Sequence, residues 1–83
     1  MEKIIKKFGE LAEVKSYEAG YEITYHGHIF TLTKDHNGII FNKMYEGERF
    51  NFPEVSLYID DVQIYRDSIS CMKNNDVICV FWV

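Results

Sequence analysis

Apolar side chains recur at helical spacing in the N-terminal segment. They fall at i, i+1, i+4, i+7 and i+8, namely Ile4, Ile5, Phe8, Leu11 and Ala12. Lysines and glutamates fill most of the positions between them. We therefore predict an amphipathic helix from residue 2 to about residue 14, with Leu11 on its buried face. Because Gly9 in the helix interior costs about 1 kcal/mol relative to alanine, this helix needs a sheet to pack on.

From Lys15 onward the apolar period changes from helical to two. Tyr21, Ile23 and Tyr25 alternate with polar residues, which predicts a strand. The pair at 26–27 contains a glycine and predicts a hairpin turn into a second strand over 28–33. An Asn-Gly pair at 37–38 favours a type I′ turn into a third strand over 39–44. These strands should form an antiparallel meander.

The rest of the chain contains a loop, an ambiguous segment and further extended runs. Residues 45–51 read as a loop, and Pro53 belongs at the start of an element or on a sheet edge. Residues 53–61 fit either a short helix or a strand, and we favour the strand. Residues 62–65 and 69–72 are extended, and 73–76 form a polar turn.

The last strand, over residues 77–83, is apolar on both faces. One face carries Val77, Cys79, Phe81 and Val83, and the other carries Ile78, Val80 and Trp82. A strand with two apolar faces is normally central in its sheet. A single helix covers only one face, so we expect part of the other face to meet a partner or a second copy of the chain.

These elements predict the α+β class: an N-terminal amphipathic helix packed on a mostly antiparallel meander of about five to six strands. At 83 residues the chain has room for one core, so residues 1–83 form a single small domain. Charges interrupt the N-terminal apolar residues, and no stretch approaches the roughly 18 apolar residues of a membrane span. We expect no membrane association and a cytoplasmic protein, which its two cysteines also suit.

The net charge of −4 argues against generic nucleic-acid binding, which needs clustered basic residues. The charge is unevenly placed, because four of the nine basic residues are lysines within residues 1–15. The alternative hypothesis is a nucleic-acid-binding protein, which would use these lysines together with strand tyrosines. The lysines are Lys3, Lys6, Lys7 and Lys15.

His26 and His28 form a His-x-His pair, which on an uninterrupted strand would point two imidazoles the same way. If Gly27 marks a turn, the two rings flank the turn and need not converge. His36 or Asp35 would have to supply a third ligand. We expect solvated turn histidines and no bound metal or cofactor, with a small metal-binding protein or enzyme as an alternative.

Cys71 and Cys79 flank the turn at 73–76. If the turn is centred between Asn74 and Asn75, the two sulfurs point to opposite faces and no disulfide forms. A register shifted by one residue would place them opposite each other. We expect buried free thiols.

Asp60 and Asp61 lie in the densest acidic cluster of the chain. Because adjacent side chains on a strand point to opposite faces, the two carboxylates need not converge on a site, and we favour a solvated turn. The chain has no phosphate-binding glycine loop and no nucleophile motif. We therefore expect no enzymatic activity and no catalytic residues.

The aromatic content is the most suggestive feature, with six tyrosines, six phenylalanines and one tryptophan. Tyrosine is enriched at protein interfaces, although it is also common on half-buried strands. The predicted interaction surface comprises Tyr21, Tyr25, Tyr58, Asp60, Asp61, Tyr65 and Trp82.

The resulting hypothesis is a non-enzymatic interaction module, a small inhibitor or regulator that binds a larger protein complex. Abundant Ile, Lys, Asn and Tyr indicate an AT-rich coding sequence. Such sequences are common in low-GC bacteria, their phages and other mobile elements. A phage-type, anti-CRISPR-like inhibitor of a host defence nuclease is the specific form of this hypothesis, with a homodimer as a further expectation.

Overall fold

The structure is a computed structural model that describes residues 1–45 and 52–83. The helices in this part are α1 (Glu2–Phe8) and a 3₁₀ turn, η1 (Gly9–Leu11). The strands are β1 (Glu13–Tyr17), β2 (Gly20–Tyr25), β3 (His28–Asp35), β4 (Gly38–Met44), β5 (Pro53–Ile59), β6 (Asp61–Ile64), β7 (Ser68–Lys73) and β8 (Asp76–Trp82). None of the described helices has the length and apolar character needed to cross a membrane.

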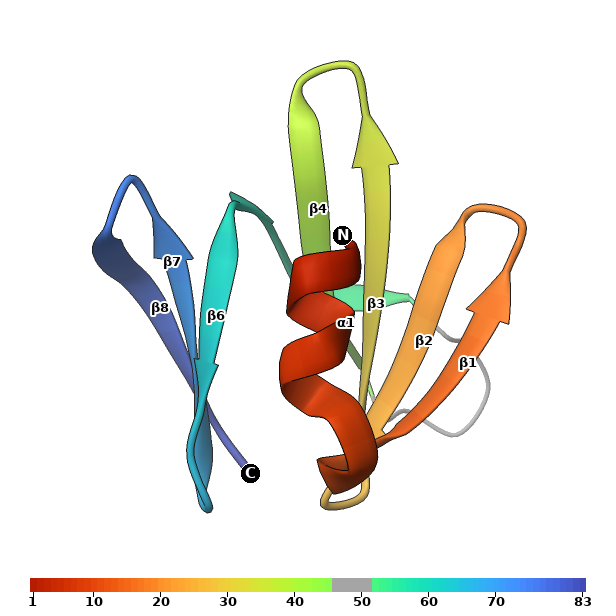
Figure 1. The fold of residues 1–83 in the computed structure, drawn as a ribbon, viewed down its shortest axis with the longest axis vertical. Helices are drawn as coiled ribbons and strands as arrows, with labels where there is room; N and C mark the ends of the chain where they lie inside the picture. The colour runs from red at the N-terminus through yellow and green to blue at the C-terminus, as the bar shows by residue number, and fades with distance from the viewer. Residues whose placement is uncertain (46–51) are drawn as a thin grey trace.

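The strands form two antiparallel sheets in which consecutive strands are neighbours (Figure 1). One sheet has the order β1-β2-β3-β4-β5, and the other has the order β6-β7-β8. The chain passes from the first sheet to the second at Asp60, whose N–H donates to the Met72 carbonyl at 2.9 Å. The predicted α+β class, with a helix on an antiparallel meander, is confirmed. There are more strands than predicted, partly because residues 13–17 form β1.

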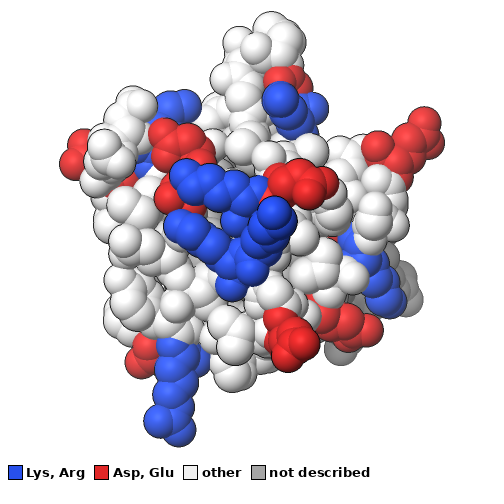
Figure 2. Space-filling view, viewed as in Figure 1, with Lys and Arg blue, Asp and Glu red and all other residues white. Residues whose placement is uncertain are grey.

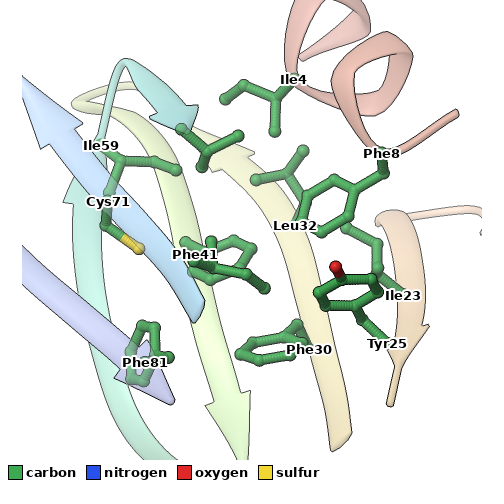
Figure 3. Packing of buried hydrophobic residues seen from close by; sticks show 12 residues of the cluster. Ile4, Phe8, Ile23, Tyr25, Phe30, Leu32, Phe41, Ile59, Cys71 and Phe81 are labelled. Atoms are coloured by element: carbon green, nitrogen blue, oxygen red, sulfur yellow. The ribbon is translucent and has the colours of Figure 1, made fainter. Parts of the chain in front are cut away.

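The helix α1 contacts β6, and its Phe8 ring packs against Tyr25 of β2 and Phe41 of β4 in the five-stranded sheet. Ile4 and Phe8 point from α1 into an apolar core that both sheets line (Figure 3). The ring of Phe41 lies in the middle of this core, with centroids 5.1 Å from Phe30 and 6.0 Å from Phe81. Helix and sheets therefore share one core, which is the packing that the amphipathic N-terminal pattern predicts.

The predicted helix over residues 2–14 is too long. Gly9 has φ 48° and ψ −129°, a conformation that glycine adopts without steric cost, and it ends α1 after Phe8. The chain continues as η1 and is extended by Ala12, at φ −132° and ψ 158°. As a result Leu11 does not lie on a buried helix face and is 63% exposed.

Two hairpins have turns at the positions that the sequence predicts. Tyr25 pairs with His28, and the turn residues His26 and Gly27 have φ 49° and 80°, as a type I′ turn requires. The turn between β7 and β8 likewise has positive φ at both central residues, Asn74 and Asn75. The predicted turns at 26–27 and 73–76 are confirmed.

The type I′ turn predicted at Asn37-Gly38 is wrong. Asp35 pairs with Gly38, so the turn residues are His36 and Asn37, and neither has positive φ. The Asp35 carboxylate instead accepts the N–H groups of Asn37 at 2.7 Å and Gly38 at 3.2 Å. An aspartate that caps its own turn thus replaces the expected geometry.

The strand reading of the ambiguous segment is confirmed, since Pro53–Ile59 is β5, and proline stands at its first position. The predicted loop over 45–51 lies, apart from Tyr45, outside the described residues.

The two apolar faces of the last strand predicted a central position in its sheet, and this prediction is wrong. In the described part of the chain β8 pairs only with β7 and forms the edge of the three-stranded sheet. A β-bulge interrupts its pairing, since Met72 pairs with Val77 but Cys71 pairs with Cys79, which leaves Ile78 as the extra residue. The bulge moves Val77 away from the face of Cys79 and Phe81.

Candidate functional site

The residues predicted as an interaction surface do not form one surface. Tyr25 is buried, and its hydroxyl donates to the Tyr65 carbonyl at 2.9 Å. Tyr21 is half-buried, with its hydroxyl 3.5 Å from a Glu2 carboxylate oxygen. Tyr65 is exposed, and its hydroxyl donates to the Gln63 side chain at 2.7 Å. Tyr25 and Tyr21 thus link β2 to neighbouring segments, whereas Tyr65 bonds locally and is the one of the three that presents much of its ring to solvent.

Tyr58 belongs to a small polar cluster at the surface. Its hydroxyl donates to Asp35 Oδ2 at 2.7 Å, and Lys73 Nζ lies 5.6 Å from its ring centroid. The hydrogen bond from Tyr58, with those from the Asn37 and Gly38 amides, lowers the pKa of Asp35 despite the opposing effect of desolvation. The same bond raises the pKa of Tyr58. The cluster links the turn after β3 to β5 and β7.

The two adjacent aspartates hold the junction between the sheets. Asp60 accepts the Asn74 N–H at 2.8 Å, and Asp61 accepts its bond from Lys7 Nζ at 2.7 Å. Lys3 Nζ also lies 3.4 Å from Asp61 Oδ2. Desolvation alone would raise the pKa of Asp61, but the hydrogen bonds from Lys7, the Val62 amide and Lys3 lower it.

The same contacts also occupy lysines of the basic helix α1. Figure 2 shows the lysines as a compact group over α1, bordered by carboxylates. Lys7 donates both to Asp61 and to the Val62 carbonyl, at 3.0 Å, so it fastens α1 to β6. Lysines that already pair with a carboxylate neutralise fewer phosphates, which weakens the hypothesis that this helix binds nucleic acid.

The strongest surface feature is a run of exposed apolar side chains on β8. Val77 is 52% exposed, Ile78 47%, Val80 39% and Trp82 70%. We call these residues the β8 strip. The alternate residue Phe81 is buried against Phe30 and Phe41, so β8 anchors itself with one face and presents the other. The predicted interaction surface included only Trp82 of these residues, although the apolar run over 77–83 already led us to expect that one face of the last strand meets a partner.

The main chain of β8 is also open along its outer edge. The Val83 N–H donates to the Asp67 carbonyl at 2.9 Å, which makes 67 and 83 a hydrogen-bonded pair in the same register as 69–81 and 71–79. Because hydrogen-bonded and non-hydrogen-bonded pairs alternate in an antiparallel ladder, Val80 and Trp82 direct their N–H and C=O groups away from β7. Figure 1 shows β8 at the margin of the fold, beside β7.

A separate apolar groove lies between η1 and β6. Two adjoining hollows, of about 370 Å³ and about 400 Å³, share Leu11, Ile64 and Tyr65 in their walls. Lys7 lines one of the hollows, and His26 and Arg66 line the other. Leu11 reaches this groove because α1 ends early, so the helical pattern could not reveal it.

The histidines do not converge on a site. His26 is a turn residue whose ring lies 4.2 Å from that of Tyr25, and His28 is the first residue of β3. Among residues 1–45 and 52–83, no three His, Cys, Asp or Glu side chains are grouped so that they could hold a metal ion.

The cysteines lie opposite each other, contrary to the register predicted for their hairpin. Cys71 pairs with Cys79 because the bulge at Ile78 adds one residue between the turn and Cys79. Both are free, with Cys71 buried and Cys79 half-buried. Desolvation, and to a lesser extent the neighbouring Cys79, raises the pKa of Cys71 to about 12. A thiol with this pKa is a poor nucleophile at neutral pH.

Comparison with models of protein families, with curated proteins and with solved structures finds no match to this chain. The site must therefore be interpreted from its own geometry, in which the β8 strip and its open edge are the features best suited to binding.

Proposed function

We propose that this chain is a non-enzymatic protein-interaction module whose binding surface is the β8 strip. One observation carries the proposal: the single tryptophan of the chain and three large aliphatic side chains lie exposed together on a strand that has an open edge. Apolar side chains and main-chain amides supply contact area and hydrogen bonds. They supply no acid, base or nucleophile.

The chemistry of the strip matches that of protein interfaces. Tryptophan is enriched among the residues that dominate binding energy. Trp82 lies at the C-terminal end of the strip, is its most exposed residue, and has Val80 beside it on the same face. Open N–H and C=O groups on an edge strand allow a partner strand to add to the sheet, which supplies main-chain hydrogen bonds in addition to side-chain contacts.

The exposure of the strip is itself unusual for an edge strand. Soluble proteins normally protect edges with charged residues, proline or a covering segment, because an apolar edge invites association. No charged residue lies between Val77 and Trp82. The bulge at Ile78 is the one protective feature that β8 has, and it leaves Val80 and Trp82 open.

Protein binding is favoured over nucleic-acid binding for two reasons. The strip carries no positive charge for phosphates, and Lys3 and Lys7 of the basic helix are already paired with Asp61. The net charge of −4 adds a repulsive background for a polyanion.

Photo-crosslinking from the strip tests this proposal. A benzophenone side chain replaces Trp82 in the chain expressed in its cells of origin, and the control places it at Tyr17, which is 45% exposed on β1. We expect discrete crosslinked protein species from position 82 that disappear when Val80 is also replaced by lysine. Equal crosslinking from positions 17 and 82 would contradict the proposal.

The narrower hypothesis, an inhibitor or regulator of a larger protein assembly, has its own test. If position 82 captures a subunit of such an assembly, the activity of that assembly is measured with the wild-type chain and with Trp82→Ala. Inhibition by the wild type that the variant loses would support the regulatory role. An unchanged activity in both cases would count against it.

A further inference from the structure

We infer that a second copy of this chain occupies the β8 strip, with the two β8 strands paired antiparallel about a two-fold axis at Val80. This inference rests on the proposed function, because it names the partner of the same surface. The two three-stranded sheets would join edge to edge into one continuous sheet.

The open main-chain groups of β8 fit this arrangement. Val80 and Trp82 both direct their N–H and C=O groups outward. In antiparallel pairing about Val80, each Val80 exchanges N–H···O=C bonds with the Val80 of the other copy. Trp82 of each copy then lies opposite Ile78 of the other, where the bulge ends the regular pairing. The outward N–H and C=O groups of Val80 therefore find partners without any change of backbone direction.

The side chains of the strip are complementary to themselves under the same two-fold operation. Directly opposed residues in an antiparallel pair have Cβ atoms about 5 Å apart, which brings the two Val80 side chains into contact. Each Trp82 ring comes beside an Ile78 of the other copy on the same outer face. An interface of this kind needs only one patch, used twice, and β8 provides it.

Charge favours a second copy over a strongly charged partner. From Val77 to Trp82 the only ionisable side chain of β8 is the thiol of Cys79, so pairing over residues 78–82 places no carboxylate opposite another. A partner rich in acidic or basic residues would find no counter-charge on the strip, and burying such charges without partners is costly. An apolar, uncharged strand is the matching surface, and the chain itself carries one.

The size of the strip limits the affinity. Exposed side chains on one short strand offer a few hundred Å² of apolar surface, less than the roughly 800 Å² per partner of a standard interface. We therefore expect a reversible dimer with a dissociation constant on the order of micromolar, rather than an obligate one.

A charge exchange at the axis provides the test. Val80→Lys and Val80→Glu each place two like charges against each other, so sedimentation velocity should show dimerisation of either variant weakened by more than about tenfold. An equimolar mixture places lysine opposite glutamate, and native mass spectrometry should detect the heterodimer. Rescue by mixing also shows that both variants are folded. The control exchange uses Val55, which is 36% exposed on β5, and should leave dimerisation unchanged.

Amide hydrogen exchange distinguishes strand pairing from simple contact between strip faces. In the wild-type dimer the N–H of residue 80 should exchange more slowly than in the Val80→Lys monomer, each relative to its intrinsic rate, while exchange in β1 stays the same. A dimer that leaves the Val80 amide unprotected, or that tolerates both charged variants, would overturn the inference.

The remaining outcomes separate this inference from the function on which it rests. A monomer at high micromolar concentration, with Trp82 fluorescence open to acrylamide quenching, would overturn the second copy as partner. The proposed function would survive that result if position 82 still crosslinks a different protein. A monomer in which Trp82 is shielded from acrylamide would overturn both, because the strip would then not be exposed.

Discussion

Phe8 and Leu11 occupy equivalent positions in the helical pattern of the sequence, yet the structure gives them opposite roles. Phe8 is fully buried, with its ring centroid 6.3 Å from Tyr25 and 6.5 Å from Phe41. Leu11 is 63% exposed on η1. We therefore predict that Phe8→Ala is strongly destabilising, whereas Leu11→Ala changes the stability little.

The magnitude follows from the burial of each side chain. Removing a fully buried phenylalanine costs about 3–5 kcal/mol, because the lost transfer energy adds to the cavity left behind. An exposed side chain removed from a surface turn changes the free energy of unfolding by about 0.5 kcal/mol or less. A chain of this length has a total stability of about 4–12 kcal/mol, so Phe8→Ala removes a large fraction of it.

Thermal and urea unfolding followed by far-UV circular dichroism measures both variants. Trp82 fluorescence is a poor reporter here, because this side chain is already 70% exposed in the folded protein. For a domain of this size, Phe8→Ala should lower Tm by more than about 12 °C and Leu11→Ala by less than about 4 °C. Equal losses in the two variants would refute the early helix end at Gly9 and restore the longer helix of the sequence pattern.

Other predictions concern the sheet junction, a close backbone contact and the buried thiol. The pKa of Asp61 lies below its usual 3.8, so its pairing with Lys7 stabilises the fold above that pH and is lost as the pH falls through the lowered pKa. Asp61→Asn should flatten the acid limb of a stability-pH curve below about pH 5, and an unaltered limb would contradict this. Gly20→Ala should destabilise the fold by about 1–3 kcal/mol or more, since its Cβ would meet the Leu32 carbonyl oxygen. Cys71 should resist alkylation at pH 8 in the folded protein and react once unfolded, because its pKa is about 12, and fast native labelling detected by mass spectrometry would contradict its burial.

Those features of the fold that depend on neighbours in the chain could be predicted from the sequence. The alternation of Tyr21, Ile23 and Tyr25 identifies a strand, because successive side chains of a strand point to opposite faces. The turn at His26-Gly27 follows from the glycine, which adopts positive φ without steric cost. The helix–sheet class then follows, since both patterns leave one apolar face that must be buried.

Tertiary structure alone decided which of the predicted interaction residues are available. Tyr25 and Trp82 are both aromatic residues on predicted strands, but Tyr25 is buried under Phe8 and Trp82 is the most exposed residue of the β8 strip. The difference arises because the strand order puts β2 inside the larger sheet and β8 on an edge. Strand order is a long-range property, and no local pattern encodes it.

The register of the last hairpin could likewise be predicted only in part from the sequence. Its turn at Asn74 and Asn75 could be predicted, because asparagine tolerates positive φ and neighbours in sequence make the turn. The bulge at Ile78 could not, although it sets Cys71 opposite Cys79 and moves Val77 out to the strip. Composition and periodicity thus determined the helix–sheet class and most of its turns by themselves. The order of the strands and the packing of Phe81 against the shared core decided which face of β8 remains open, because burial of one face depends on contacts with residues far away in the chain.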